Sequence, residues 1–267
     1  MKRTLSGIVI LILALVLIIP GGYVTWAGAL LLSMFAMFEL YRVFGIEKSL
    51  LGIVGYLSAL FYYVTILPIP GLALPSGLWV AATILSVFSV YVIRYTDYKL
   101  QQFLGAILAP FYIAFLMSHL YLIRLMDHGI WLIWIPVVAA CGCDIFAFLI
   151  GSKFGKHKMA PHLSPKKSKE GSVGGVVAAT LLGVLFGAAM DFFATGLNGM
   201  IWKCGLICLA GSVICEIGDL AASAIKRQMD VKDYSNLIPG HGGILDRFDS
   251  LLFTGTMVYY ILLLMGM

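Results

Sequence analysis

The amino-acid sequence predicts an all-α, polytopic integral membrane protein with about nine transmembrane helices, a cytoplasmic N-terminus and a C-terminus outside. Three observations support this fold class. The 267 residues are 61% hydrophobic and 12% charged, which is more apolar surface than a water-soluble core can bury. Apolar runs of about 20 residues recur along the chain. Lysine and arginine are concentrated in alternate connections between these runs.

The apolar runs define the expected helices in order. They cover residues 5–20, 23–40, 50–68, 77–93, 103–123, 130–150, 172–194, 200–222 and 248–266. The first run follows Lys2 and Arg3, and no small-residue cleavage site separates it from the second run. We therefore expect it to be a retained helix and not a signal peptide.

The basic residues orient these helices. Lys2 and Arg3 place the N-terminus in the cytoplasm under the positive-inside rule. All 18 Lys and Arg residues except Arg124 and Lys203 then fall on the cytoplasmic side. One helix more or fewer in the middle would reverse every later connection, so this distribution favours nine. The expected location is the inner (cytoplasmic) membrane.

Polar residues are concentrated in the C-terminal half. We expect residues 1–125 to be a scaffold or lipid-contacting module, and residues 126–267 to be the catalytic region. The two substantial polar loops, 151–171 and 226–247, both lie on the predicted cytoplasmic side, so an active site should face the cytoplasm. The five cysteines lie in apolar runs without histidine, which argues against a metal site built from them.

Carboxylates inside the predicted spans need a reason, because an aspartate at the bilayer centre costs roughly 2.5–3.5 kcal/mol. Glu216, Asp219 and Ser223 share one helical face at spacing i, i+3, i+7. Asp246 and Asp249 share a face at the start of the last helix, and Asp144 lies at a similar depth in its own span. This set needs more positive charge than side chains at that depth supply. Carboxylate ligands favour a hard ion such as Mg²⁺, which usually also binds substrate phosphates.

Two further acids have simpler interpretations. Glu39 lies at a helix end with Arg42 at i+3, a spacing typical of a surface ion pair. Asp191 lies near the outer end of its span, where it can reach the membrane interface.

Both polar loops contain residue types that bind phosphate. In 151–171, basic residues alternate with Gly, Ser and Pro, which suits one bound anion or a polybasic surface attracted to anionic lipid. Gly174-Gly175 is expected to open the next helix, with N–H groups available to phosphate. In the second loop, Pro239-Gly240-His241-Gly242-Gly243 predicts a tight turn that allows close backbone approach to a ligand. His241 is either a proton carrier or a structural hydrogen-bonding residue.

The run from Ser223 to Asp249 resembles the signature of the CDP-diacylglycerol synthase (phosphatidate cytidylyltransferase) family. The matching positions are Ser223, Lys226, Arg227, Lys232, Asp233, Pro239, His241, Gly242, Gly243, Asp246, Arg247 and Asp249. The resemblance extends upstream to Asp144, residues 151–156 and Ser164 to Lys167, which covers roughly the C-terminal half. Ser152 stands where a basic residue is expected, and Ser168 stands where Thr is common. The N-terminal half resembles the family only in being helical and apolar.

The resemblance implies a nucleotidyltransferase of phospholipid biosynthesis. A phosphate oxygen of phosphatidate would attack the α-phosphorus of CTP, giving CDP-diacylglycerol and pyrophosphate. Asp219 and Asp246 would bind Mg²⁺, with Asp144 and Asp249 as further ligands and room for a second cation. The implied catalytic residues are Asp144, Lys167, Asp219, Asp246 and His241. The implied phosphate-binding residues are Lys153, Ser164, Lys166, Lys167, Ser223, Lys226, Arg227, Lys232, Gly242, Gly243 and Arg247. Expected partners are CTP, phosphatidate and membrane lipids, with a homodimer left open and no nucleic acid.

Two other functions compete with this one. A CTP transferase acting on a different lipid phosphate, such as an isoprenoid-ether or polyprenyl phosphate, would need the same residues. A cation-coupled transporter also carries acids within its spans, but it would place charge at the bilayer midplane and contain paired broken helices. Neither property is evident in the sequence.

Overall fold

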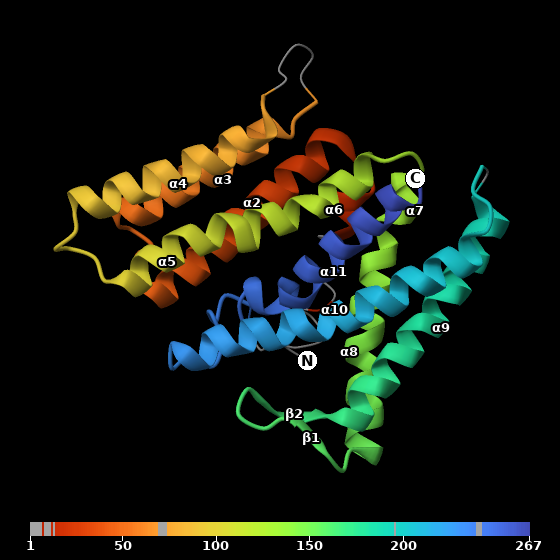
Figure 1. Ribbon diagram of the computed structural model, residues 1–267. Coiled ribbons are helices and arrows are strands. Elements are labelled where there is room, and N and C mark those ends of the chain that lie inside the picture. Colours follow the sequence, from red (N-terminus) through yellow and green to blue (C-terminus); the bar gives the residue numbers. More distant parts are fainter. Residues whose placement is uncertain (1–6, 8–11, 13, 69–73, 195, 239–241) are drawn as a thin grey trace. The chain divides into compact units, whose positions relative to one another are not determined.

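The computed structural model describes the whole chain except residues 1–6, 8–11, 13, 69–73, 195 and 239–241. The described part is mostly helical, which agrees with the predicted all-α fold (Figure 1). Its one sheet has two strands. Within the described residues, six helical segments are long and apolar enough to cross a membrane, and two shorter apolar helices accompany them. Seven of the 16 residues of the predicted span 5–20 lie outside the described residues, and residues 14–18 are helical. The number nine and the orientation of the termini therefore stay predictions.

The expected apolar runs from residue 23 onward all coincide with helices. Their observed bounds are α2 Gly22–Phe44, α3 Leu50–Thr65, α4 Ser76–Ile93, α5 Leu100–Ala109, the π-helix η1 Pro110–Phe115, α6 Leu116–Leu125, α7 Gly129–Leu132, α8 Trp134–Phe154, α9 Lys169–Phe193, α10 Met200–Gln228 and α11 Leu245–Leu264. The chain divides into two compact units, each described below by itself. One comprises Met1–Tyr121 and Val231–Arg247, and the other comprises Leu122–Asp230 and Phe248–Met267.

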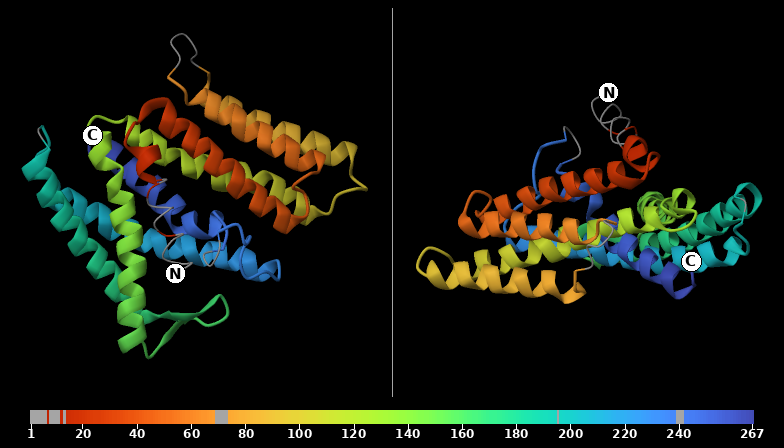
Figure 2. Two further views of the ribbon diagram at one scale, coloured as in Figure 1. Left: turned by 180° about the vertical axis from the view of Figure 1, so that it is seen from behind. Right: turned by 90° about the horizontal axis from the view of Figure 1, so that it is seen from above.

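Helices α2 to α5 run alongside one another in the first unit (Figures 1 and 2). Polar side chains link these apolar helices. The Tyr41 hydroxyl donates to the Ala106 carbonyl at 3.0 Å, and the Ser33 and Tyr63 hydroxyls lie 2.8 Å apart. The Tyr62 hydroxyl lies 2.7 Å from that of Ser118 in α6. Hydrogen bonds between membrane helices contribute on average about 0.6 kcal/mol each, so van der Waals packing supplies much of the remaining stabilisation.

Glycines along α9 allow close helix packing in the second unit. A Cβ atom on Gly175 would lie 2.7 Å from the carbonyl oxygen of Cys143 in α8. A Cβ atom on Gly183 would lie 2.7 Å from the carbonyl oxygen of Cys204 in α10. The first half of α9 therefore packs against α8 and its second half against α10, with backbones in direct contact (Figure 1).

A β-hairpin connects α8 and α9, where the sequence predicts only a loop. Strand β1 (Lys158–Ala160) pairs antiparallel with β2 (Ser164–Ser168). Helix α9 begins at Lys169 because the Ser168 hydroxyl caps it, accepting the Gly171 N–H at 3.2 Å. The expectation that Gly174-Gly175 opens this helix is wrong. The pair lies inside α9, where a Cβ atom on Gly174 would meet the side chain of Ile150.

The second predicted loop is shorter than expected. Helix α10 continues to Gln228 and α11 begins at Leu245, so the connection between the two helices covers 229–244 in place of 226–247. Lys226 and Arg227 therefore lie in the last turn of α10. Asp246 lies in the first turn of α11.

Candidate functional site

Lys167 brings the basic hairpin and the acidic face of α10 together in the second unit. Its ammonium lies 2.7 Å from Glu216 Oε2 and 2.5 Å from Asp219 Oδ2. Glu216 is buried, with 5% of its side chain exposed, while Lys167 and Asp219 are partly exposed. Burial opposes the charge of Lys167, but Asp219 and Glu216 outweigh it and raise the pKa of the ammonium above its usual value. Lys167 is therefore charged at neutral pH.

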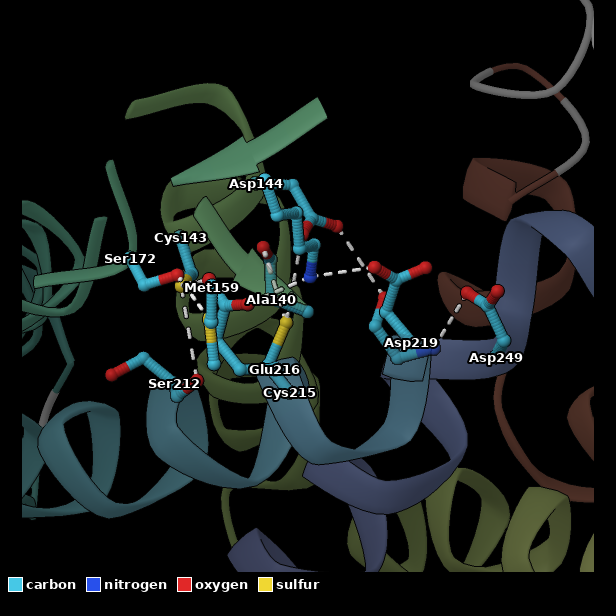
Figure 3. Close-up of polar contacts among 12 residues, drawn as sticks. Ala140, Cys143, Asp144, Met159, Ser172, Ser212, Cys215, Glu216, Asp219 and Asp249 are labelled. Atoms are coloured by element: carbon cyan, nitrogen blue, oxygen red, sulfur yellow. Dashed lines mark hydrogen bonds and ion pairs between the residues drawn. The ribbon is translucent and has the colours of Figure 1, made fainter. Parts of the chain in front are cut away.

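Two more predicted ligands lie near this ion-pair cluster. Asp144 in α8 accepts a hydrogen bond from the Ser250 hydroxyl at 3.4 Å and a weak one from the Cys215 thiol at 3.8 Å (Figure 3). The Asp249 carboxylate is buried and accepts the Ser250 N–H at 2.8 Å. Asp144, Asp219 and Asp249 are close enough to interact electrostatically. Helices α8, α10 and α11 thus gather three predicted ligands of the second unit.

The donor atoms of this cluster suit a hard cation. Carboxylate oxygens are the ligands that Mg²⁺ prefers, and Mg²⁺ is usually bound by one or two carboxylates with water and substrate phosphates completing its shell. Among the described residues, no three His, Cys, Asp or Glu side chains converge closely enough to form a complete protein site. Lys167 is bound directly to Asp219, so its ammonium already neutralises that carboxylate.

The described part of the signature segment in the first unit is organised around Asp246. Its Oδ2 atom accepts the Tyr234 N–H at 2.9 Å and the Gly243 N–H at 3.0 Å. Gly242 has φ 79°, and a Cβ atom there would lie 3.0 Å from the same oxygen. The expected backbone approach at the glycine pair is thus made to a protein carboxylate. Pro239, Gly240 and His241 lie outside the described residues, and so does the role predicted for His241.

Glu39 is not the surface residue that its spacing from Arg42 predicts. Its side chain is buried, and it accepts hydrogen bonds from the Ser235 hydroxyl and from the N–H groups of Ile244 and Leu245. No ion pair joins it to Arg42 in the described part of the chain. Donors that lie about 200 residues away in the sequence replace the expected partner three residues away.

Asp191 also has a defined structural role. It accepts the N–H of Met200 at 2.9 Å and of Ile201 at 3.3 Å, and so caps α10 instead of merely reaching the interface.

A cavity of about 1220 Å³ lies in the first unit between α2 and residues 231–237. Leu31, Phe35 and Phe38 of α2 provide apolar wall. Arg42 at the end of α2 and Lys232 line the cavity with positive charge, beside Asp233. Lys232 is one of the predicted phosphate-binding residues.

The remaining predicted residues are distributed over the two units. Lys153 lies at the end of α8, Ser164 and Lys166 lie on β2, Ser223, Lys226 and Arg227 lie on α10, and Arg247 lies in the first turn of α11. The second unit brings Asp144, Lys167, Asp219 and Asp249 together. The first unit brings Gly242, Gly243 and Asp246 together. Glu216 and Ser250 are direct partners of predicted site residues that were not themselves assigned a role there. The sequence places Glu216 on the same helical face as Asp219, and this spacing is the signal for its position. No comparable signal marks Ser250.

Comparisons with known proteins cover nearly the whole chain. The sequence model of the cytidylyltransferase family matches residues 1–265. The protein named phosphatidate cytidylyltransferase in Staphylococcus saprophyticus is 32% identical over 94% of each chain. Its namesake in Bacillus subtilis is also 32% identical, over 98% of this chain and 97% of the relative. A namesake in Staphylococcus aureus (strain COL) is 30% identical over 94% of each chain.

Proposed function

We propose that this chain, which belongs to the cytidylyltransferase family, is a phosphatidate cytidylyltransferase that transfers CMP from CTP to phosphatidate. The observation that carries this assignment is Lys167, which joins the basic hairpin to Glu216 and Asp219 beside Asp144. Enzymes that transfer phosphoryl groups need positive charge and carboxylate-bound metal around the same phosphates. The second unit assembles both kinds of residue.

The chemistry requires positioning more than activation. A phosphate oxygen of phosphatidate is already anionic, and it attacks the α-phosphorus of CTP. A new P–O bond forms as the bond from the α-phosphorus to the bridging oxygen breaks, and pyrophosphate leaves with the electron pair. Lys167, Lys226 and Arg227 hold phosphate groups and neutralise their charge.

Mg²⁺ is part of the proposal. Asp219 and Asp246 would hold it, with Asp144 and Asp249 as further ligands, as the family resemblance implies. Bound there, it would supply charge neutralisation at the reacting phosphates. The carboxylate oxygens and the phosphate substrate support this choice of ion.

The cavity of the first unit supports a lipid substrate. Its apolar wall comes from α2, a helix long and apolar enough to span a membrane, and Arg42 and Lys232 line it as well. Phosphatidate has the same two parts, acyl chains and an anionic phosphate. We place its phosphate at Arg42 and Lys232, with an acyl chain along Phe35 and Phe38.

The proposed location is the inner membrane, with nine spans and a cytoplasmic site. The distribution of Lys and Arg supports this orientation. CTP then arrives from the cytoplasm and phosphatidate from the inner leaflet. A homodimer stays a prediction.

The test is an assay of the purified protein with labelled CTP, phosphatidate and Mg²⁺. Pyrophosphate release and a labelled liponucleotide are expected. Asp219→Asn and Asp246→Asn should each lower kcat about 100-fold or more. Asp97→Asn, at an exposed residue paired with Arg94, is the matched control and should retain activity. Retained activity in either site variant would remove its metal assignment.

The same assay separates the competing functions. Phosphatidate is replaced by an isoprenoid-ether phosphate or a polyprenyl phosphate in parallel reactions. Faster transfer to one of these would change the substrate. No transfer to any lipid phosphate, together with ion flux in proteoliposomes, would favour the transporter.

A further inference from the structure

We propose that Glu39 is a positioning residue for nucleotidyl transfer, and that it fixes the backbone of residues 234–235 and 243–246 from helix α2. The proposal rests on the proposed function, because residues of that segment carry the predicted substrate and metal contacts. It assigns a role in the reaction to a helix that the sequence suggests is scaffold.

The contacts of Glu39 satisfy three donors with one carboxylate. Oε1 accepts the Ser235 hydroxyl at 2.5 Å and the Ile244 N–H at 2.9 Å, and Oε2 accepts the Leu245 N–H at 2.8 Å. The side chain is 2% exposed. Leu245 is the first residue of α11, where N–H groups have no partner within the helix and favour a negative charge. Glu39 therefore caps α11 from another helix.

Glu39 and Asp246 act on the same two stretches of backbone. Tyr234 donates to Asp246 while its neighbour Ser235 donates to Glu39. Gly243 donates to Asp246 while its neighbour Ile244 donates to Glu39. The two carboxylates thus bridge residues 234–235 to residues 243–245.

Gly243 shows how closely Glu39 approaches this backbone. A Cβ atom at position 243 would lie 2.6 Å from Oε2 and 2.7 Å from Oε1 of Glu39. Any larger residue there would displace the carboxylate or the backbone. The second glycine of the signature is therefore required by the packing of Glu39, independently of any ligand.

A carboxylate is needed for this arrangement because all three partners are donors. A glutamine would have nearly the same size, but its NH₂ group would face a backbone N–H of residue 244 or 245. It would also remove the negative charge at the start of α11. Glu39→Gln therefore removes the charge and one acceptor atom of residue 39 with little change in side-chain volume. It tests whether these two properties hold the backbone of residues 234–235 and 243–246 in place.

The first experiment compares Glu39→Gln with Glu47→Gln by hydrogen–deuterium exchange without substrates. Glu47 is a matched control because it follows the same helix and its side chain makes no recorded hydrogen bond or ion pair in the described part of the chain. Exchange in peptides covering 234–246 should rise about tenfold or more in Glu39→Gln only. Peptides covering α3 and the hairpin should be unchanged. Ser235→Ala, which removes one of the three donors, should give a smaller rise in the same peptides.

The second experiment measures the reaction in the same variants. Glu39→Gln should lower kcat/KM for CTP about 10–100-fold, with Ser235→Ala between it and the wild type. Unchanged exchange at 234–246 would overturn the proposal, whether or not activity falls. Increased exchange across α2 and α3 as well would also overturn it, because Glu39 would then support the fold in general. A local rise in exchange in a protein without transferase activity would refute the proposed function, and would leave only the fixing of this backbone by Glu39.

Discussion

At the residue scale, Lys167 shows how a predicted phosphate-binding residue can also hold a site together. It reaches from β2 to two acids on α10, one of them buried. Its ammonium neutralises Glu216 in a place where an unpaired carboxylate would be costly. The Lys167 ammonium can therefore both bind phosphate and stabilise the two acids. Variants can separate these two roles.

Lys167→Ala should lower the free energy of unfolding by about 2–4 kcal/mol, because it leaves Glu216 buried without its cation. Lys167→Ala/Glu216→Gln should recover most of that stability but not the transferase activity. Thermal unfolding in detergent and the CTP assay measure the two effects. Lys169→Ala, at an exposed residue just beyond β2, is the control. A fully stable single variant would contradict the structural role of the ion pairs.

Arg42 provides a second test at this scale. Arg42→Gln should raise KM for phosphatidate about tenfold and leave KM for CTP unchanged, because the side chain lines the cavity proposed for the lipid phosphate. Arg94→Gln at the end of α4 is the matched control. An equal increase in KM for phosphatidate and in KM for CTP would contradict a specific role of Arg42 in lipid binding.

At the element scale, the helices follow from composition, but their ends do not. Apolar runs locate α2 to α11 because a membrane helix must bury its backbone polar groups internally. The hairpin is not predicted, since Lys158–Ala160 and Ser164–Ser168 are short and lack an apolar alternation. The start of α9 depends on the Ser168 cap, which is a local hydrogen bond within a polar stretch.

The packing of α9 gives a prediction at this scale. Gly183→Ala should destabilise the protein by about 1–3 kcal/mol, because its Cβ would lie 2.6 Å from Cys208 Cβ and 2.7 Å from the Cys204 carbonyl oxygen. Gly77→Ala is the control, since nothing lies within 4 Å of its Cβ position. It should be neutral or stabilising by up to about 1 kcal/mol. Melting temperatures in detergent compare the two, and equal values would contradict direct backbone packing.

At the scale of the whole molecule, the sequence identifies candidate site residues better than it predicts which distant residues contact them. The signature from Ser223 to Asp249 identifies the family because residue identities and spacings are visible along the chain. The contacts of Glu39 are not visible, because Ser235 and Leu245 lie 196 and 206 residues away. Periodicity reports the surroundings of one helix and carries no information on such distant donors.

The topology is testable at the same scale. A C-terminal alkaline phosphatase fusion after Met267 should be active, and a fluorescent-protein fusion there should be dark, because nine spans starting inside end outside. The same reporters joined after Ala160 should give the opposite result. A fluorescent C-terminal fusion would place the C-terminus in the cytoplasm and contradict nine spans with a cytoplasmic N-terminus.

The distance from Glu39 to its donors also has a consequence for biogenesis. At synthesis rates of about 5–20 residues per second, Leu245 follows Glu39 by roughly 10–40 seconds. Until Ser235 is made, the nascent chain contains α2 with its acid and none of the three partners. A chain that ends before residue 235 therefore carries the Glu39 carboxylate in α2 without any of its three donors.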